Sequence, residues 1–260
     1  LSNNSSLIFK GGNVKIESNK KCRTKISGDG TGGIAFIDSP EVSIKNIIFN
    51  NLSSPIIPGV SFTGAVTAAN SVIKIINTSI LHSRSEDGLN IVRSNYHLDN
   101  VSVNNSFSDG IDIDYGFGAL IDVNISNSGN DGLDVSGTLV NLDNLIILHS
   151  GDKGISVGEK SSVIAENINI DTALIGVASK DSSIAVINGL SVKNTKHPLL
   201  ALNKKPEYKG GNMEIETNID NYKILSKDYL LDNTSIIKIN GKKLITNSTT
   251  KRLKSDLYNK

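Results

Sequence analysis

A glycine recurs every 22 residues through the middle of this chain, at Gly88, Gly110, Gly132, Gly154 and Gly176. Each glycine is followed by an apolar, variable, apolar pattern, and a second, weaker apolar segment follows each of the first four. A fixed period of this length is typical of a solenoid, in which each repeat stacks on its neighbours. The repeat therefore limits the chain to an architecture that can be extended one turn at a time.

The repeats consist of short runs of Ile and Val separated by Asn, Ser, Asp and Gly, with no helical periodicity. Alternating short strands between turn residues predict β-structure. A leucine-rich repeat has a similar period, but the chain lacks the L-x-x-L-x-L spacing of that class. We therefore predict an all-β fold, a single-stranded right-handed parallel β-helix (solenoid) with about 22 residues per turn.

The composition agrees with a thin coil. The 260 residues include 31 asparagines and only six Phe and six Tyr, with no Trp. Equivalent asparagines on successive turns form ladders, which explains their number. The few aromatic residues predict a core filled by Ile, Leu and Val.

The regular pattern weakens towards both ends of the chain. Residues 1–205 are predicted to form the parallel β-helix, with a loop at Ser53–Gly59. The glycine register is lost after about Lys205, so residues 206–260 are predicted to form an irregular C-terminal cap or extension with a flexible basic tail from Lys251. A linker to a further domain is the alternative.

The fixed period predicts which way each side chain points. By strand alternation, the first and third residues after each glycine face the interior, whereas the second and fourth face outwards. The predicted interior residues of the first column are Leu89, Ile111, Leu133, Ile155 and Val177. The outward columns and the position before each glycine are acidic in the central repeats: Asp87, Asp109, Asp112, Asp114, Asp131 and Asp134.

These aspartates have two interpretations. Asp-Gly is a common turn pair, so Asp87, Asp109 and Asp131 are equally well explained as turn residues that accept backbone N–H bonds. Asp112 and Asp134 fall inside strands, where Asp is disfavoured, and like charges on adjacent strands repel. Such a cluster in an otherwise regular fold predicts a functional site on this side of the coil.

Several segments carry a resemblance to known proteins: EDGLNIVRS at 86–94, GNDGLDVSG at 129–137, GDKGISVGEKS at 151–161, GVASKDSS at 176–183 and KKPEY at 204–208. From Phe62 to Tyr208 the chain resembles right-handed parallel β-helix proteins of the pectate-lyase-like superfamily. Within that superfamily it looks most like uncharacterised bacterial β-helix repeat domains. The resemblance implies a carbohydrate-directed protein, and such an analogy transfers fold better than mechanism.

A polysaccharide lyase is the first activity that the resemblance implies, with an acidic polysaccharide as substrate. Lys153 or Lys180 would remove the proton next to a uronate carboxylate, which Arg93 would neutralise. Calcium is the expected cofactor, because it would relieve the effect of the acids on the lysine pKa. The residues expected to hold it are Asp109, Asp112, Asp131 and Asp134.

A glycoside hydrolase is the second activity, with Asp109, Asp131 and Asp134 as candidate acid and base. The resemblance to galacturonan hydrolases ends at DGIDI (109–113), because their following Asp-Asp pair and His motif are absent. Across the two activities, the candidate catalytic residues are Lys153, Lys180, Arg93 and Asp131. The candidate substrate-binding residues are Glu86, Asp87, Asn90, Asp109, Glu159, Asp181 and Lys204.

A non-catalytic protein is the alternative: a surface or adhesin-like structural solenoid that bound calcium would stabilise. In that interpretation Lys153 is an ion-pair partner of Asp131, and Glu86 and Glu159 are solvated charges. Few aromatic residues, chiefly Tyr115 and Phe117, stand in outward positions, which argues against a sugar-stacking platform.

Charge and hydropathy exclude some partners. The net charge is +1 and no basic patch lies outside the tail, which argues against nucleic acid. No apolar run approaches the roughly 20 residues of a membrane-spanning helix. The chain has one cysteine, Cys22, and begins at Leu1 without a signal-peptide pattern. We expect an extracellular, cell-surface or periplasmic location with a polysaccharide as partner, and the sequence predicts no oligomeric state.

Overall fold

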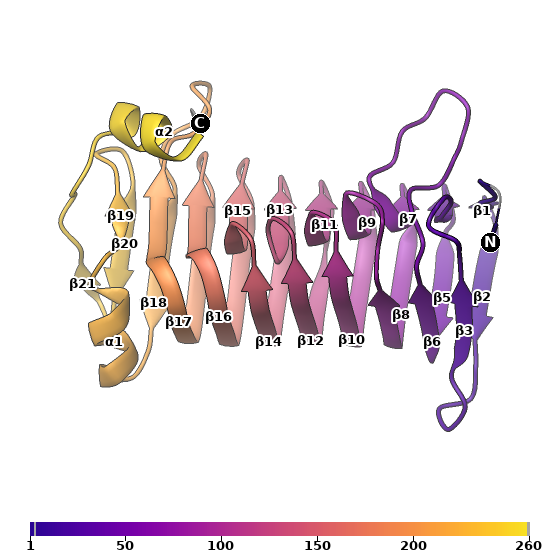
Figure 1. Cartoon of the computed structure of the whole chain (residues 1–260). Coiled ribbons are helices and arrows are strands. Elements are labelled where there is room, and N and C mark those ends of the chain that lie inside the picture. The colour runs from indigo at the N-terminus through magenta and orange to yellow at the C-terminus, as the bar shows by residue number, and fades with distance from the viewer. Residues whose placement is uncertain (3, 259–260) are drawn as a thin grey trace.

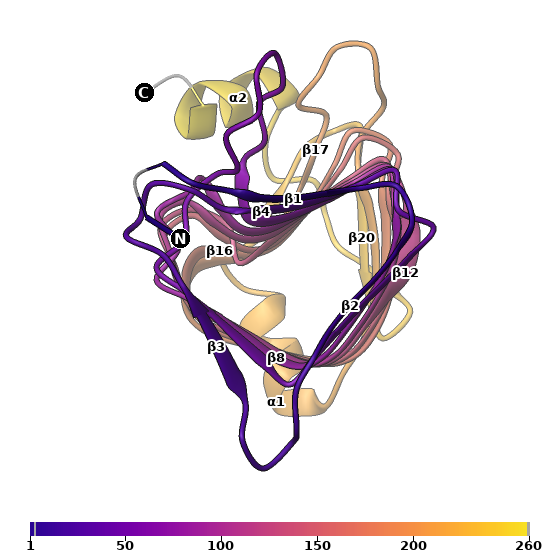
Figure 2. The same cartoon turned by 90° about the vertical axis from the view of Figure 1, so that its right-hand side faces the viewer.

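A computed structural model describes residues 1–2 and 4–258 of the chain. They form a parallel β-solenoid of about 10 turns with roughly 23 residues per turn, which confirms the predicted fold class (Figure 1). Viewed from the N-terminal end, the chain runs clockwise as it recedes, so the coil is right-handed (Figure 2). Strands on successive turns pair in parallel and in register on three faces, which we call A, B and C.

Face A carries the predicted acidic residues. Its strands are β1 (Leu7–Lys10), β4 (Ile34–Ile37), β7 (Gly64–Ala69), β9 (Asp87–Val92), β11 (Asp109–Asp114), β13 (Leu133–Ser136), β15 (Lys153–Gly158), the last parts of β16 (Ser162–Lys180) and β17 (Ile184–Leu202), and β19 (Leu230–Leu231).

Faces B and C share several long strands that bend at the corner between them. Face B holds β2 (Asn13–Glu17), β5 (Glu41–Lys45), the first parts of β8 (Val72–Leu81), β10 (Asn95–Ser106), β12 (Phe117–Ser128), β14 (Leu139–Ser150), β16 and β17, then β18 (Asn212–Glu216) and β20 (Ile236–Ile239). Face C holds β3 (Thr24–Ser27), β6 (Ile47–Asn50) and the parts of β8, β10, β12, β14, β16 and β17 that follow the corner.

The core is a stack of aliphatic side chains inside the coil. Leu89, Ile111, Leu133, Ile155 and Val177 are at most 1% exposed, as the strand alternation predicted. Each such side chain contributes about 1.5–3 kcal/mol through its burial. The interior direction of these residues leaves the residues between them on the outer surface of face A.

The repeated glycine is required by close packing. At Gly110, a β-carbon would lie 2.3 Å from Cγ2 of Ile125 and 2.6 Å from the carbonyl oxygen of Gly132 on the next turn. Gly88 and Gly132 meet equivalent neighbours, so the same contact recurs on successive turns. The period read from the sequence therefore marks the place where face A approaches the inner side of face C.

The predicted asparagine ladder lies at the corner between faces B and C. Asn46, Asn77 and Asn100 have φ values of 59°, 47° and 51°, in the left-handed region that Asn tolerates well. Nδ2 of Asn100 donates to Oδ1 of Asn77 at 2.6 Å, and Nδ2 of Asn77 donates to Oδ1 of Asn46 at 3.2 Å. The ladder thus pairs polar groups along the corner.

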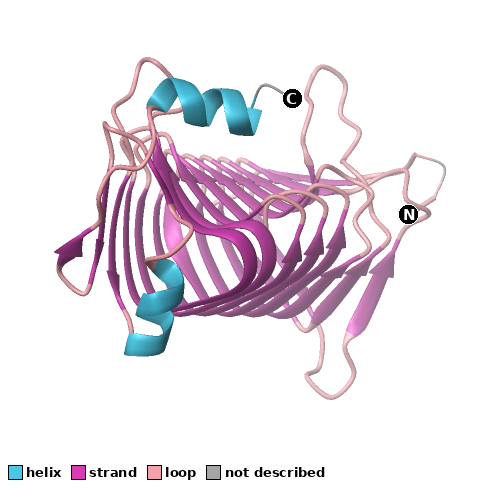
Figure 3. Ribbon diagram, turned by 60° about the vertical axis from the view of Figure 1, so that its left-hand side comes forward, coloured by secondary structure: helices cyan, strands magenta, loops and turns pink. Residues whose placement is uncertain are grey.

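The C-terminal region continues the strand stacking of face B. Face B continues through β18 and β20, so the coil extends beyond residue 205, because these strands keep stacking without the face A glycine. The predicted cap consists of α1 (Ile219–Leu225) at the C-terminal end and β21 (Lys242–Lys243), which pairs antiparallel with β20 (Figure 3). The expected flexible tail is helical over its described part, as α2 (Thr250–Tyr258).

The helix α2 lies over the C-terminal end of face A (Figures 2 and 3). Its Leu253 is 2% exposed and belongs to a separate apolar cluster with Ile175, Ala178, Leu200 and Leu202. These residues point out of the coil, so α2 supplies the cover that their apolar side chains need. Among the described residues, no helix is long and apolar enough to cross a membrane.

Candidate functional site

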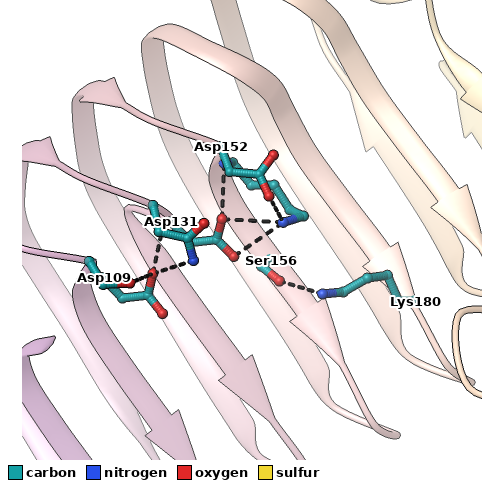
Figure 4. Close-up of polar contacts among 8 residues, drawn as sticks. Asp109, Asp131, Asp152, Ser156 and Lys180 are labelled. Atoms are coloured by element: carbon teal, nitrogen blue, oxygen red, sulfur yellow. Dashed lines mark hydrogen bonds and ion pairs between the residues drawn. The ribbon is translucent and has the colours of Figure 1, made fainter. Parts of the chain in front are cut away.

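A stacked column of aspartates lies along the edge of face A where its strands begin. Oδ1 of Asp109 accepts a hydrogen bond from the backbone N–H of Asp131 at 2.8 Å, and Oδ1 of Asp131 accepts one from the N–H of Lys153 at 3.0 Å (Figure 4). Both aspartates are buried. Their contacts match the turn interpretation of the Asp-Gly pairs, in which the carboxylate joins one turn to the next.

Lys153 forms a buried ion pair at the end of this column. Its Nζ lies 3.3 Å from Oδ1 of Asp131 and also contacts the carboxylate of Asp152. Burial acts to lower the pKa of the Lys153 ammonium, but the Asp131 and Asp152 carboxylates raise it by more, so the pKa lies above its usual value. A general base needs the opposite shift, so the structure favours the ion-pair interpretation of Lys153.

Lys180 extends back across face A towards the previous turn. Its Nζ donates to Oγ of Ser156 at 2.7 Å, and both side chains are buried (Figure 4). Ser156 was expected on the outer surface, and its direction is as predicted. Lys180 covers it, however, and neither lysine presents an unoccupied amine to solvent.

The middle of face A holds a second polar column, formed by Asn90, Asp112, Asp134 and Ser156 in register on four successive turns. Nδ2 of Asn90 donates to Oδ2 of Asp112 at 3.0 Å. Asp112 and Asp134 are both half-buried, and Oδ1 of Asp134 has no hydrogen-bond partner among the described residues. These two carboxyls are the predicted site residues that the fold brings side by side, with no backbone N–H or ion-pair partner among the described residues.

Burial and mutual repulsion favour the protonated forms of Asp112 and Asp114. Burial raises the pKa of Asp112 to about 9, and the nearby carboxyls of Asp114, Asp87 and Asp134 add to the shift. The pKa of Asp114, on the same strand, is raised by burial and by Asp134. Asp112 therefore carries a proton at neutral pH.

The edges of face A hold the remaining predicted residues. Burial raises the pKa of Asp87 to about 7, and one of its oxygens, Oδ2, has no partner among the described residues. Glu86 is exposed next to it. On the opposite edge, Arg93 is exposed and its guanidinium lies 5.9 Å from the ring centroid of Tyr115. Arg93 forms no ion pair with any described residue.

Glu159, Asp181 and Lys204 lie near the C-terminal end of the face and have structural contacts. The carboxylate of Glu159 pairs with Lys205, and Oδ1 of Asp181 accepts the backbone N–H groups of Lys204 and Lys205, both at 2.7 Å. The Lys204 ammonium lies 4.5 Å from the ring centroid of Tyr258. Burial, with the charges of Lys180 and Lys153, lowers the pKa of Lys204.

The described residues of face A do not form a set of ligands for calcium. The described residues contain no group of three or more His, Cys, Asp or Glu side chains placed to hold a metal ion. Asp109 and Asp131 use an oxygen each on backbone N–H groups, whereas calcium takes about six to eight oxygen ligands. Calcium at Asp109, Asp112, Asp131 and Asp134 stays a prediction.

Two projections stand over the ends of face A. The loop between β6 and β7 rises at the N-terminal side, and α2 with the loop of residues 203–211 lies at the C-terminal side (Figures 1 and 3). Sequence reasoning missed Tyr258, whose hydroxyl is buried without a partner among the described residues and whose pKa burial raises to about 12. The apolar Leu253 and Leu257, four residues apart in a basic tail, were the available signal for this helix.

The sequence matches no family model and no curated protein. Three solved structures with a similar course of the chain are catalytic domains of GH87 α-1,3-glucanases, each at a TM-score of 0.31. A variant in complex with tetrasaccharides is 10% identical, over 95% of this chain and 62% of its own. The catalytic unit from Streptomyces thermodiastaticus strain HF3-3 is 10% identical, over 83% of this chain and 62% of its own.

The third, in complex with nigerose, is 12% identical and covers 82% of this chain and 52% of its own. This chain thus spans less than two thirds of the length of each of these domains. The strand pairing of the chain itself confirms the parallel β-helix that the sequence resemblance implied. Membership of the pectate-lyase-like superfamily stays a prediction.

Proposed function

We propose that this protein is a carbohydrate-acting β-helix that hydrolyses a glycosidic bond at the middle of face A, with Asp112 and Asp134 as its two carboxyls. One observation carries the proposal. These residues are in register on adjacent turns of face A, both half-buried and pointing out of the coil. Neither is tied to a backbone N–H or to an ion-pair partner among the described residues, unlike Asp109 and Asp131.

Their spacing suits a retaining mechanism. Strands on adjacent turns lie about 4.8 Å apart, and retaining glycosidases place their two carboxyl groups about 5 Å apart. Asp112, held neutral by its raised pKa, donates its proton to the oxygen of the leaving sugar. The carboxylate of Asp134, whose side chain is half-buried, attacks the anomeric carbon, and the bond to the leaving oxygen breaks. The Asp112 carboxylate then takes a proton from the water that releases the glycosyl group.

The same geometry disfavours the lyase mechanism. That mechanism needs an unprotonated lysine and a cation beside the uronate carboxylate. Lys153 is paired with two carboxylates, and Lys180 is bonded to Ser156. The ionised Asp134 that the proposed mechanism uses as its nucleophile would also repel a uronate. We therefore propose an uncharged sugar ring at Asp112 and Asp134.

The test is a panel of neutral polysaccharides, including α-1,3-glucan, and uronic-acid polysaccharides. Reducing ends report hydrolysis, and absorbance of the unsaturated product reports a lyase. We expect reducing ends from a neutral polymer with retained anomeric configuration by proton NMR, and a loss of about 100-fold or more in Asp112→Asn and Asp134→Asn.

The matched control is Asp143→Asn, because Asp143 is an exposed aspartate on face B. It should keep the wild-type rate. The wild-type rate in all three variants, Asp112→Asn, Asp134→Asn and Asp143→Asn, would remove face A from consideration. A wild-type protein that cleaves no member of the panel would favour the structural solenoid.

A further inference from the structure

A second polar surface lies on the side of the coil opposite face A. The loop that joins β2 to β3 projects from the N-terminal turns, away from face A (Figure 2). A hollow of about 190 Å³ lies between this loop and the corner of faces B and C. Its lining consists of two basic residues and a wall of amides and hydroxyls: Lys20, Arg23, Asn46, Asn77, Ser79, Asn100 and Ser102.

Arg23 is held in place on one side and left unpaired on the other. Its Nη2 donates to the carbonyl oxygen of Ile47 and to Oγ of Ser79, both at 2.9 Å. Its Nε is buried and has no partner, and Nη1 donates to no group among the described residues. The guanidinium is therefore oriented by the protein, while part of its donor capacity is unused.

The wall behind Arg23 is satisfied by its own contacts. The amide of Asn100 donates to Asn77, that of Asn77 to Asn46, and that of Asn46 to the carbonyl oxygen of Ser18 at 2.5 Å. Oγ of Ser102 donates to Oγ of Ser79 at 2.7 Å. This chain of hydrogen bonds fixes the wall and requires no ligand for itself.

The charge in the hollow is not balanced. None of the described lining residues is acidic, and neither Lys20 nor Arg23 forms an ion pair with any described residue. Lys20 is exposed on the projecting loop, and its side chain forms no hydrogen bond with the part of the chain that the structure describes. Two cations thus face one polar hollow with unused donors, which is the chemistry that recognises an oxyanion.

We propose that this hollow binds one oxyanion group, such as a sulfate or a phosphate, between the Arg23 guanidinium and the Lys20 ammonium. Its volume corresponds to roughly six water molecules at about 30 Å³ each, which is room for a tetrahedral oxyanion and a few waters. The group is either a free ion or an ester on a sugar. This site is separate from the carboxyls of face A, so its test does not depend on the proposed hydrolase.

The experiment is isothermal titration calorimetry of the whole chain with sodium sulfate and sodium phosphate, against sodium chloride at matched ionic strength. We expect Arg23→Gln to raise the dissociation constant about tenfold or more, because it removes an oriented, charged donor. Lys20→Gln should raise it at least about threefold. Lys21→Gln is the matched control, because Lys21 lies beside Lys20 on the same loop and does not line the hollow.

Lys20→Gln guards against a folding artefact, since the Lys20 side chain forms no hydrogen bond or ion pair with any described residue, whereas Arg23 anchors the loop. Equal effects of Lys20→Gln and Lys21→Gln, or no heat above that of chloride, would overturn the site. Glucose 6-sulfate and glucose 6-phosphate identify the source: tighter binding than the free ions points to a sugar ester, and equal or weaker binding to a free ion. Cys22, the single cysteine of the chain and exposed, allows a fluorophore to report binding at this loop.

Discussion

Nζ of Lys153 lies 3.3 Å from Oδ1 of Asp131 on the preceding turn, and the two side chains are only 5% and 3% exposed. Removing one partner of a buried pair leaves the other charge without compensation, which costs about 3–5 kcal/mol. We expect Lys153→Met to lower the free energy of unfolding by that amount in urea denaturation. Lys153→Met combined with Asp131→Asn should recover part of the loss, because the buried Asp131 charge is then removed and only the partly exposed Asp152 lacks its partner.

The control for this pair is Lys238→Met. Lys238 and Glu214 form an exposed pair at 2.7 Å on face B, with side chains 44% and 52% exposed. Exposed pairs contribute about 0–1 kcal/mol. Similar losses in Lys153→Met and Lys238→Met would show that Lys153 is solvated.

The repeated glycine should tolerate no side chain. Gly110→Ala places a β-carbon against Ile125 and the Gly132 carbonyl, and we expect a loss of about 1–3 kcal/mol from overpacking. Gly158→Ala is the matched change, because its nearest neighbour would be Cε of Lys180 at 3.7 Å. Urea denaturation should show a neutral or stabilising effect there, and a cost equal to that of Gly110→Ala would contradict the packing explanation.

Stability should fall as the pH rises across the neutral range. The pKa values of Asp87 and Asp112, about 7 and about 9, are above the value of about 3.9 for an unfolded aspartate. Between these values the folded state holds protons that the unfolded state has lost, so the free energy of unfolding decreases with pH. We expect it to decrease from about pH 4 to about pH 9.

Asp112→Asn tests the sign of this dependence. It should raise the free energy of unfolding at pH 8 by at least about 1 kcal/mol and change it little at about pH 3, where Asp112 is mostly protonated in both states. Asp143→Asn, on exposed face B, should leave the profile unchanged. A profile that rises between pH 5 and pH 9 would show that these acids are stabilised as carboxylates.

The attachment of α2 should depend on its leucine and not on its tyrosine hydroxyl. Leu253→Ala opens a cavity in the cluster with Ile175 and Leu200, at a cost of about 2–5 kcal/mol, and should increase amide hydrogen exchange in α2. Tyr258→Phe removes a buried hydroxyl that has no partner among the described residues, and the change should be neutral or stabilising. Faster exchange in Tyr258→Phe would indicate a hydrogen bond at that hydroxyl.

The sequence was sufficient for the coil and for the direction of its side chains. The glycine period specified the face A register, so Leu89 and Ile111 were correctly placed inside, and Asp112 and Asp134 side by side. Strand alternation is a local rule, and identical spacing makes it hold on every turn. The period specifies where these residues lie, and the role of each residue depends on contacts that the period does not specify.

What covers each outward residue was not predictable from the period. Ser156 and Lys180 occupy outward positions and are nevertheless buried, since Lys180 folds back over Ser156 and α2 packs nearby. The α2 contact joins segments that no repeat relates, and the period does not specify the conformation of the Lys180 side chain. Leu200 and Leu202, apolar in outward positions, were the sign that another segment had to cover this end.

The in-register stacking of face A also makes the molecule adjustable in length. The loop between β6 and β7 and helix α2 stand at opposite ends of the acidic turns (Figure 1). Since Asp109 pairs with Asp87 and Ile111 with Leu133, each 22 residues away, excising or duplicating one repeat would join equivalent positions. The distance between the two projections would then change by one strand spacing, about 4.8 Å, so the number of turns sets how far apart they stand.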